Sequence, residues 1–294
     1  MDNRKIGVLD SGIGGLTVVR ALFDALPNER LIYFGDSLNV PYGNRPKADV
    51  TRLSTRIIEF LKRKDVKAIV VACNTSSSIC IDELRKAAGM PVIDVLTHSA
   101  VAVASVAAES VGIIATYNAV ESGAHERIIR TENPALRVYA RSCPLLVPII
   151  EEGLCETEIA YAAARYYLSE FEDNKIDCLL LGCTHYPLLA TALRSAIKVP
   201  IIDPAAYVAE AMKSCLIDMD ALAVVSGQWS VVSGQGSGVS GQGSVVRGQG
   251  SVVRGQWSGV SGQHEFFTSG DPAVFDEHVR RVLGIEAKSV RVLY

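Results

Sequence analysis

The sequence has little net charge and no closely spaced pair of cysteines. Its formal net charge of −3 argues against bulk electrostatic attraction to nucleic acid or to an anionic membrane. Its seven cysteines are odd in number and include no C-x-x-C, so the usual zinc and redox-pair signatures are missing. We therefore expect a cytoplasmic protein with reduced thiols, no bound metal and no nucleic-acid partner.

The chain also lacks long apolar runs. No stretch has the length and apolarity of a membrane-spanning helix, and the N-terminus has no apolar signal core. Residues 1–4 are polar, and the apolar run at 6–9 is long enough only for a strand. We expect no membrane partner. The 294 residues, 49% of them apolar, are enough for two ordinary domains.

Short apolar runs alternate with amphipathic stretches in the first third of the chain. The expected strands are residues 6–9, 31–35, 68–72 and 92–94. Between them the apolar residues recur at helical spacing, as in Leu16, Val19, Phe23 and Leu26. Runs that are apolar on both faces and are separated by helices predict a parallel sheet covered on both sides.

The same pattern restarts near Leu96, with expected helices at 157–171 and 188–197 and expected strands at 111–115, 137–140, 178–182 and 201–203. Three short motifs of the first half recur in order in the second half. They are GVLDS with GIIAT, VACNT with LGCTH, and PVID with PIID. Three matches in order, at similar intervals, predict a duplicated α/β unit. The fold class is therefore α/β, with two pseudo-symmetric doubly wound domains and mainly parallel sheets.

The expected domain boundaries follow from this duplication. The first domain combines residues 1–95 with 205–225 and 264–294, including helices at 204–218 and 273–283 and a last strand at 290–293. The second domain is 96–204. Residues 226–263 repeat a seven-residue unit rich in glycine and serine, such as SGQGSVV. Such repeats rarely pack a core, so we expect a surface insertion whose two ends lie close together.

Two cysteines stand directly after expected strands, Cys73 in VVACNTSSS and Cys183 in LLLGCTHYP. In open parallel sheets the carboxyl edge of the strands is where ligands bind. Hydroxyl or amide residues and a predicted helix start follow each cysteine, which favours a thiolate. The other five cysteines (80, 143, 155, 178 and 215) are interpreted as small core residues.

Other candidate residues lie in loops at the same edge. The glycine-rich stretch LDSGIGGLT at 9–17 departs from the dinucleotide-binding fingerprint, but its amides would suit a carboxylate, and it contains Asp10. The loop GDSLNVPYGNRP at 35–46 is polar and suited to binding. Of the five histidines only His185 lies in a motif. His98 is expected in the core or at an interface, and the remaining three, at 125, 264 and 278, on the surface.

Two thiols facing one cleft admit few chemistries. A disulfide would be inert, a metal site would need more ligands than His185 supplies, and a Cys-His hydrolase would leave one thiol unexplained. Two acid/base groups on opposite faces of one substrate carbon account for the duplication. One removes a proton and the other returns a proton to the opposite face. The reaction is then inversion of a stereocentre.

Five stretches resemble the glutamate racemase family: IGVLDSGIGGLTVVRAL, YFGDSLNVPYGNRP, VVACNTSSS, LLGCTHYPLL and FFTSGDP. The resemblance covers residues 1–218 and 264–294 in order. It implies cofactor-independent interconversion of L- and D-glutamate for peptidoglycan biosynthesis, in a homodimer with the active site between two domains. No lysine occurs in the motifs, so a pyridoxal Schiff base finds no support.

The resemblance also implies roles for individual residues. Cys73 would act on D-glutamate with help from Asp10, and Cys183 on L-glutamate with help from His185. A carboxylate of VPIIEEG would contribute, and we assign it to Glu151, although Glu152 is adjacent. The residues implied to hold the substrate are Asp10, Ser11, Pro41, Tyr42, Gly43, Asn74, Thr75, Thr116, Thr184 and His185.

Two alternatives stay open at this point. An aspartate racemase or another two-cysteine isomerase would share the same motifs, because the substrate side chain is selected by pocket shape. A non-catalytic binding protein of the same fold is the alternative from a different class. The presence of both cysteines, Asp10 and His185 favours catalysis.

Overall fold

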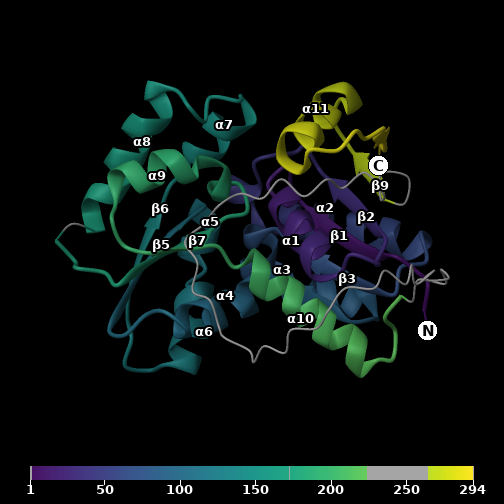
Figure 1. Ribbon diagram of the computed structural model, residues 1–294, viewed down its shortest axis with the longest axis horizontal. Helices are drawn as coiled ribbons and strands as arrows, with labels where there is room; N and C mark the ends of the chain where they lie inside the picture. The colour runs from purple at the N-terminus through teal and green to yellow at the C-terminus, as the bar shows by residue number, and fades with distance from the viewer. Residues whose placement is uncertain (1, 172, 224–263, 294) are drawn as a thin grey trace, which may run out of the picture.

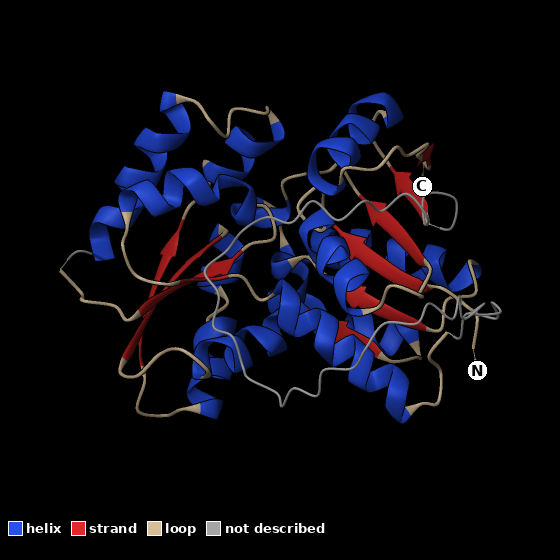
Figure 2. Ribbon diagram, in the orientation of Figure 1, coloured by secondary structure: helices blue, strands red, loops and turns tan. Residues whose placement is uncertain are grey.

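The computed structural model describes residues 2–171, 173–223 and 264–293, which form two lobes side by side (Figure 1). Each lobe is built on one parallel sheet, with helices on both of its faces (Figure 2). The predicted α/β class with parallel sheets is confirmed. Among the described residues, no helix is both long and apolar enough to cross a bilayer.

The first lobe contains a six-stranded sheet, and the second lobe a four-stranded one. The order in the first is β10 (Val290–Arg291), β9 (Glu265–Thr268), β2 (Leu31–Gly35), β1 (Ile6–Asp10), β3 (Ala68–Val71), β4 (Val92–Asp94). The order in the second is β6 (Arg137–Ser142), β5 (Ser110–Ala115), β7 (Cys178–Gly182), β8 (Ile201–Ile202). The order β2-β1-β3-β4 therefore corresponds to β6-β5-β7-β8, as the three matched motifs require.

The helices connect these strands in the alternation that parallel pairing demands. They are α1 (Leu16–Ala25), α2 (Lys47–Arg63), α3 (Asn74–Ala88), α4 (Val95–Ala104), α5 (Tyr117–Glu121), α6 (Ala124–Glu132), α7 (Leu146–Glu151), α8 (Glu158–Leu168), α9 (Ala190–Ala196), α10 (Ala205–Asp218) and α11 (Pro272–Leu283). Short 3-10 turns include η1 (Tyr42–Asn44), η2 (Ser169–Phe171) and η3 (Tyr186–Leu189). The apolar face expected for α1 is buried, because Leu16, Val19 and Phe23 all lie in the core.

Two strand expectations need correction. The sequence analysis did not predict β9, which lies between β10 and β2 in the first sheet and pairs in parallel with both. Its four residues follow directly on the glycine-rich repeat, so the run is too short to show a period of its own. The last strand, β10, covers two residues instead of the four expected, and both are exposed.

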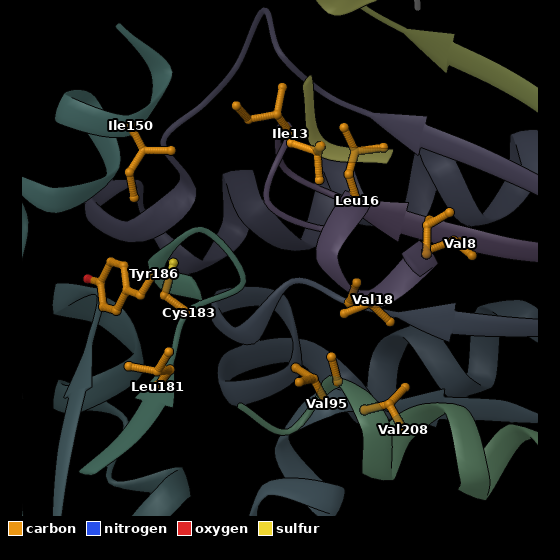
Figure 3. Close-up of a cluster of buried hydrophobic side chains, with 14 of the residues drawn as sticks. Val8, Ile13, Leu16, Val18, Val95, Ile150, Leu181, Cys183, Tyr186 and Val208 are labelled. Atoms are coloured by element: carbon orange, nitrogen blue, oxygen red, sulfur yellow. The ribbon is translucent and has the colours of Figure 1, made fainter. Parts of the chain in front are cut away.

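The two lobes share a continuous apolar core. One cluster of buried side chains contains Val8 and Ile13 from the first lobe together with Ile150, Leu181 and Tyr186 from the second (Figure 3). Burying apolar surface is favourable by roughly 25 cal/mol per Å². The packing therefore holds the carboxyl ends of the two sheets against each other.

The chain returns to the first lobe along α10, which packs against α1 (Figure 1). The segment after α10 is fixed by a buried ion pair in which Lys67 Nζ lies 2.7 Å from Glu29 Oε2. Lys67 also donates to the carbonyl of Ala221, and the amide of Ala223 donates to Glu29 Oε1 at 2.7 Å. These contacts support the proposed assignment of the segment to the first domain.

The seven-residue repeat at 226–263 lies outside the described residues, but both of its flanks are described. Ala223 bonds Glu29, and the Nδ1 of His264 accepts a hydrogen bond of 3.1 Å from the amide of Leu31. The two flanks therefore meet at one short stretch of chain, between Glu29 and Leu31.

Candidate active site

The candidate site lies where the carboxyl ends of the two sheets face each other. Asp10 ends β1 and Cys73 follows β3 in the first lobe, while Thr116 follows β5 and Cys183 follows β7 in the second. In each lobe these two strands are neighbours and lie where the strand order reverses, which is the switch point where ligands bind in such sheets.

A pocket with an empty volume of about 260 Å³ lies between these ends. It is lined by Ser11, Pro41, Tyr42, Gly43, Cys73, Asn74, Thr75, Thr116, Val147, Cys183, Thr184 and His185. The pocket therefore brings together both cysteines and every expected substrate-binding residue except Asp10, whose carboxyl group accepts a hydrogen bond from the lining residue Thr184. Val147 is the one lining residue that the sequence analysis missed, because an apolar helix residue carries no site signal.

Cys73 caps the N-terminus of α3 and is buried. Its Sγ lies 3.5 Å from the backbone amide of Ser76, which donates to it. Burial raises the pKa of the Cys73 thiol from 9.0 to about 11, and the charge of Asp10 acts in the same direction. At Cys73, desolvation therefore opposes the thiolate that the helix terminus favours.

Asp10 is fully buried and links the two lobes. Its Oδ2 accepts a hydrogen bond of 3.0 Å from the amide of Gly12, and its Oδ1 accepts one of 3.2 Å from the hydroxyl of Thr184. Burial raises the pKa of Asp10, against the opposing effects of His185 and of these hydrogen bonds. The carboxyl group is close enough to the Cys73 thiol for its charge to add to the effect of burial on the pKa of that thiol.

Cys183 has a different set of neighbours. The Nδ1 of His185 lies 3.8 Å from its Sγ, and the Nε2 of His185 lies 2.6 Å from Glu151 Oε1. Burial alone would lower the pKa of His185, but the hydrogen bonds to Cys183 and Glu151 raise it well above 6.5. The imidazole of His185 therefore lies between Cys183 and Glu151 and is favoured in its protonated form.

Glu151 completes this chain of contacts. Burial would raise its pKa, but the hydrogen bond and charge of His185 prevail and lower it. Its Oε1 also accepts from the amide of Ile13 at 3.4 Å. The neighbouring Glu152 is exposed, so the geometry supports the choice of Glu151 as the site carboxylate.

The glycine-rich loop at 9–17 has a role that composition alone did not predict. A Cβ on Gly14 would lie 2.4 Å from His185 Nδ1, and one on Gly12 would lie 2.5 Å from Glu151 Oε1. Both positions must therefore be glycine for the His185–Glu151 pair to approach. The loop amides of Gly12 and Ile13 donate to the carboxylates of Asp10 and Glu151.

Hydroxyl and amide groups join the two lobes around the pocket. The hydroxyls of Thr75 and Thr116 lie 2.8 Å apart across the lobe boundary. The side-chain amide of Asn118 donates to the carbonyls of Tyr42 and Arg45, at 3.2 and 2.7 Å. These bonds hold the loop at 35–46 over the pocket, where its binding role was expected.

Two of the histidines expected on the surface are buried instead. His125 is 4% exposed and His278 is 9% exposed, whereas His264 is partly buried. Helical spacing contained the missing signal: His125 is four residues before the buried Ile129, and His278 is four before the buried Val282. His98 is partly buried, and its Nδ1 lies 2.9 Å from the carbonyl of Asp94.

All seven cysteines are free thiols. Of the five interpreted as core residues, Cys80, Cys143 and Cys178 are buried, whereas Cys155 and Cys215 are only partly so. None of the five lines the pocket. Cys73 and Cys183 thus differ from the other five cysteines because they line the pocket, and not because of burial alone.

Comparison with known proteins agrees with this geometry. A family described as Asp/Glu/Hydantoin racemase matches residues 6–212. The glutamate racemase of Neisseria meningitidis serogroup C is 46% identical over 210 residues, which span 70% of this chain and 78% of the relative. Glutamate racemase 2 of Caldanaerobacter subterraneus is 43% identical over 219 residues, spanning 74% and 82%.

Solved structures are similar over the whole chain. The glutamate racemase of Francisella tularensis, crystallised with D-glutamate, is 33% identical with a TM-score of 0.83, covering 100% of this chain and 98% of its own. The glutamate racemase isoform RacE1 of Bacillus anthracis is 30% identical with a TM-score of 0.84, with the same coverage.

Proposed function

The chain belongs to the Asp/Glu/Hydantoin racemase family, and on this premise we propose that Cys73 and Cys183 are the paired acid and base by which it interconverts L- and D-glutamate. The observation that carries the proposal is that the two thiols come from different lobes and line the same pocket. Two acid/base groups on opposite sides of a substrate carbon perform inversion without a covalent intermediate.

The reaction balances with these two thiols alone. Starting from L-glutamate, the sulfur of Cys183 takes the Cα proton, and the resulting carbanion takes the thiol proton of Cys73 on its opposite face. Cys183 is then protonated and Cys73 is a thiolate, which is the arrangement that D-glutamate requires. The reverse reaction uses the same groups in exchanged roles.

The Cα–H bond of an amino acid is a weak acid, so the developing carbanion needs stabilisation. We assign this to the donors around the pocket, which would bind the α-carboxylate as its charge grows. The groups are the hydroxyls and amides of Ser11, Asn74, Thr75, Thr116 and Thr184, all of which line the pocket. Pro41, Tyr42 and Gly43 line it as well and would contact the remainder of the substrate.

The similarity to glutamate racemases supports a role of the product D-glutamate in peptidoglycan biosynthesis. We further propose a homodimer, and a cytoplasmic location that suits the seven free thiols. The expected assembly can be checked by light scattering on the purified protein.

The direct test of function is a circular-dichroism assay with each enantiomer of glutamate and of aspartate. We expect turnover of both glutamate enantiomers, with kcat/KM for aspartate lower by about 10- to 200-fold, because one missing methylene loses about 1–3 kcal/mol of binding. Faster turnover of aspartate than of glutamate would identify aspartate as the preferred substrate. A folded protein that racemises neither amino acid would contradict the proposed activity.

A further inference from the structure

His125 lies between the two cysteine loops, although it belongs to neither motif. It is the second residue of α6 in the second lobe, and it is buried. Its Nε2 lies 3.2 Å from Oδ1 of Asn74, the residue that follows Cys73. A Cβ on Gly182, the residue before Cys183, would lie 3.2 Å from the same nitrogen. The ring therefore contacts both sides of the site at once.

The amide of Asn74 is only half satisfied. Its Oδ1 faces His125, whereas its Nδ2 is buried and has no hydrogen-bond partner in the part of the chain that the structure describes. Leaving a buried donor unpaired costs about 1–3 kcal/mol. Asn74 lines the pocket, so a substrate carboxylate would supply the partner that the amide group lacks.

The position of the imidazole proton on His125 determines which way the Asn74 amide can point. Burial lowers the pKa of His125 to about 4, so the imidazole is neutral at neutral pH and has a single N–H. With that proton on Nε2, the ring donates to Oδ1 of Asn74 and leaves Nδ2 free for the substrate. The opposite tautomer would accept from the amide and turn its carbonyl towards the substrate carboxylate, where two acceptors repel.

We propose that His125 is a positioning residue, which holds the Asn74 amide with its N–H groups towards the carboxylate of the substrate. This inference depends on the proposed racemase function and assigns a second-lobe residue to a first-lobe binding group. His125 itself does not line the pocket, so it acts through Asn74.

The test compares replacements of His125 that differ in one donor. His125→Gln places an N–H near the position of Nε2, whereas His125→Asn is too short and His125→Phe has no donor. We expect kcat/KM for glutamate to fall by about 10- to 100-fold in the Asn and Phe variants, mainly through KM, and to recover largely in the Gln variant. Thermal melting of each variant verifies that the fold is intact.

A double-mutant cycle with Asn74→Ala isolates the coupling. If His125 acts through Asn74, His125→Phe should have no further effect once the amide is gone. A full additional loss in that background, or wild-type kinetics in the Phe and Asn variants, would overturn the proposal. Isothermal titration with D-glutamate gives a readout that needs no turnover. Failure of the wild type itself to racemise glutamate would instead contradict the proposed function.

Discussion

The two thiols occupy equivalent places in two copies of one unit, yet their surroundings differ. Cys183 faces the His185–Glu151 pair. The hydrogen bonds of His185 to Cys183 and Glu151 raise the pKa of its imidazole. Cys73 faces the buried carboxyl group of Asp10, and its own pKa rises to about 11. Duplication thus supplies the geometry of inversion, while the residues that differ between the copies give the two thiols different electrostatic surroundings.

This difference between the two thiols indicates which one donates a proton first. The raised pKa of Cys73 favours its thiol form, which can donate a proton to the substrate. This preference matches the proposed reaction from L-glutamate, in which Cys73 donates the proton. Because two enantiomers have equal free energy, kcat/KM must be the same in both directions, so the asymmetry can appear only in the separate values of kcat and KM.

Removing either thiol should have the largest effect. In Cys73→Ala or Cys183→Ala one face of the substrate loses its acid/base group, and we expect racemisation to fall by about 10³- to 10⁴-fold. Cys215→Ala is the control, since that thiol is partly exposed and does not line the pocket. Turnover close to the wild-type rate in either thiol variant would show that the replaced thiol is not the acid/base group of one substrate face.

Gly14→Ala should affect the Cys183 half selectively. The added Cβ would come within 2.6 Å of the Thr184 hydroxyl as well as close to His185, so the imidazole must shift. We expect kcat/KM to fall by about tenfold or more, as a displacement of this size misplaces a catalytic group. Gly7→Ala is the matched control, because its Cβ would meet only the flexible side chain of Leu61 at 3.1 Å. Equal losses in both variants would indicate a general defect in packing.

The His185–Glu151 pair should make stability depend on pH. The folded-state pKa of Glu151 is below 4.5, so its contribution to the free energy of unfolding is lost as pH falls through that folded-state pKa. The folded-state pKa of His185 is above 6.5, so its contribution is lost as pH rises through that higher value. The pair therefore stabilises most between about pH 4.5 and 6.5. We expect Glu151→Gln to lower the free energy of unfolding by about 1–3 kcal/mol there, and by less on either side. Urea unfolding of both proteins across about pH 4–9 measures the difference in the free energy of unfolding between wild type and variant. A difference that does not change with pH would contradict the ion pair.

The smallest effect is expected from the seven-residue repeat. The flanking residues Ala223 and His264 bond Glu29 and Leu31, so a short Gly-Ser linker in place of residues 226–263 can join them. Loop-closure entropy changes only logarithmically with length, so turnover should stay within about twofold of the wild type. Melting temperature and assembly state are measured alongside. A collapse of turnover or a changed assembly would give the repeat a structural role.

Much of the site could be predicted because it follows from chain order. The strand positions of Cys73 and Cys183 and the matched motifs required the corresponding strand orders that the two sheets have. Contacts between distant segments could not be predicted in the same way. The space that Gly12 and Gly14 leave for Glu151 and His185, and the burial of His125 against Asn74, depend on how the lobes pack. The raised pKa of Cys73 likewise depends on burial, which outweighs the local signal of a helix terminus.

The most direct test is the fate of the Cα hydrogen when L-glutamate reacts in deuterium oxide. With Cys183 as base and Cys73 as acid on opposite faces, early product should be D-glutamate with solvent deuterium at Cα, while the recovered L-glutamate keeps its protium. Mass spectrometry of the separated enantiomers distinguishes the two pools. Deuterium that appears in recovered L-glutamate as fast as in D-glutamate would show that one base serves both faces, and would contradict the assignment of separate roles to the two thiols.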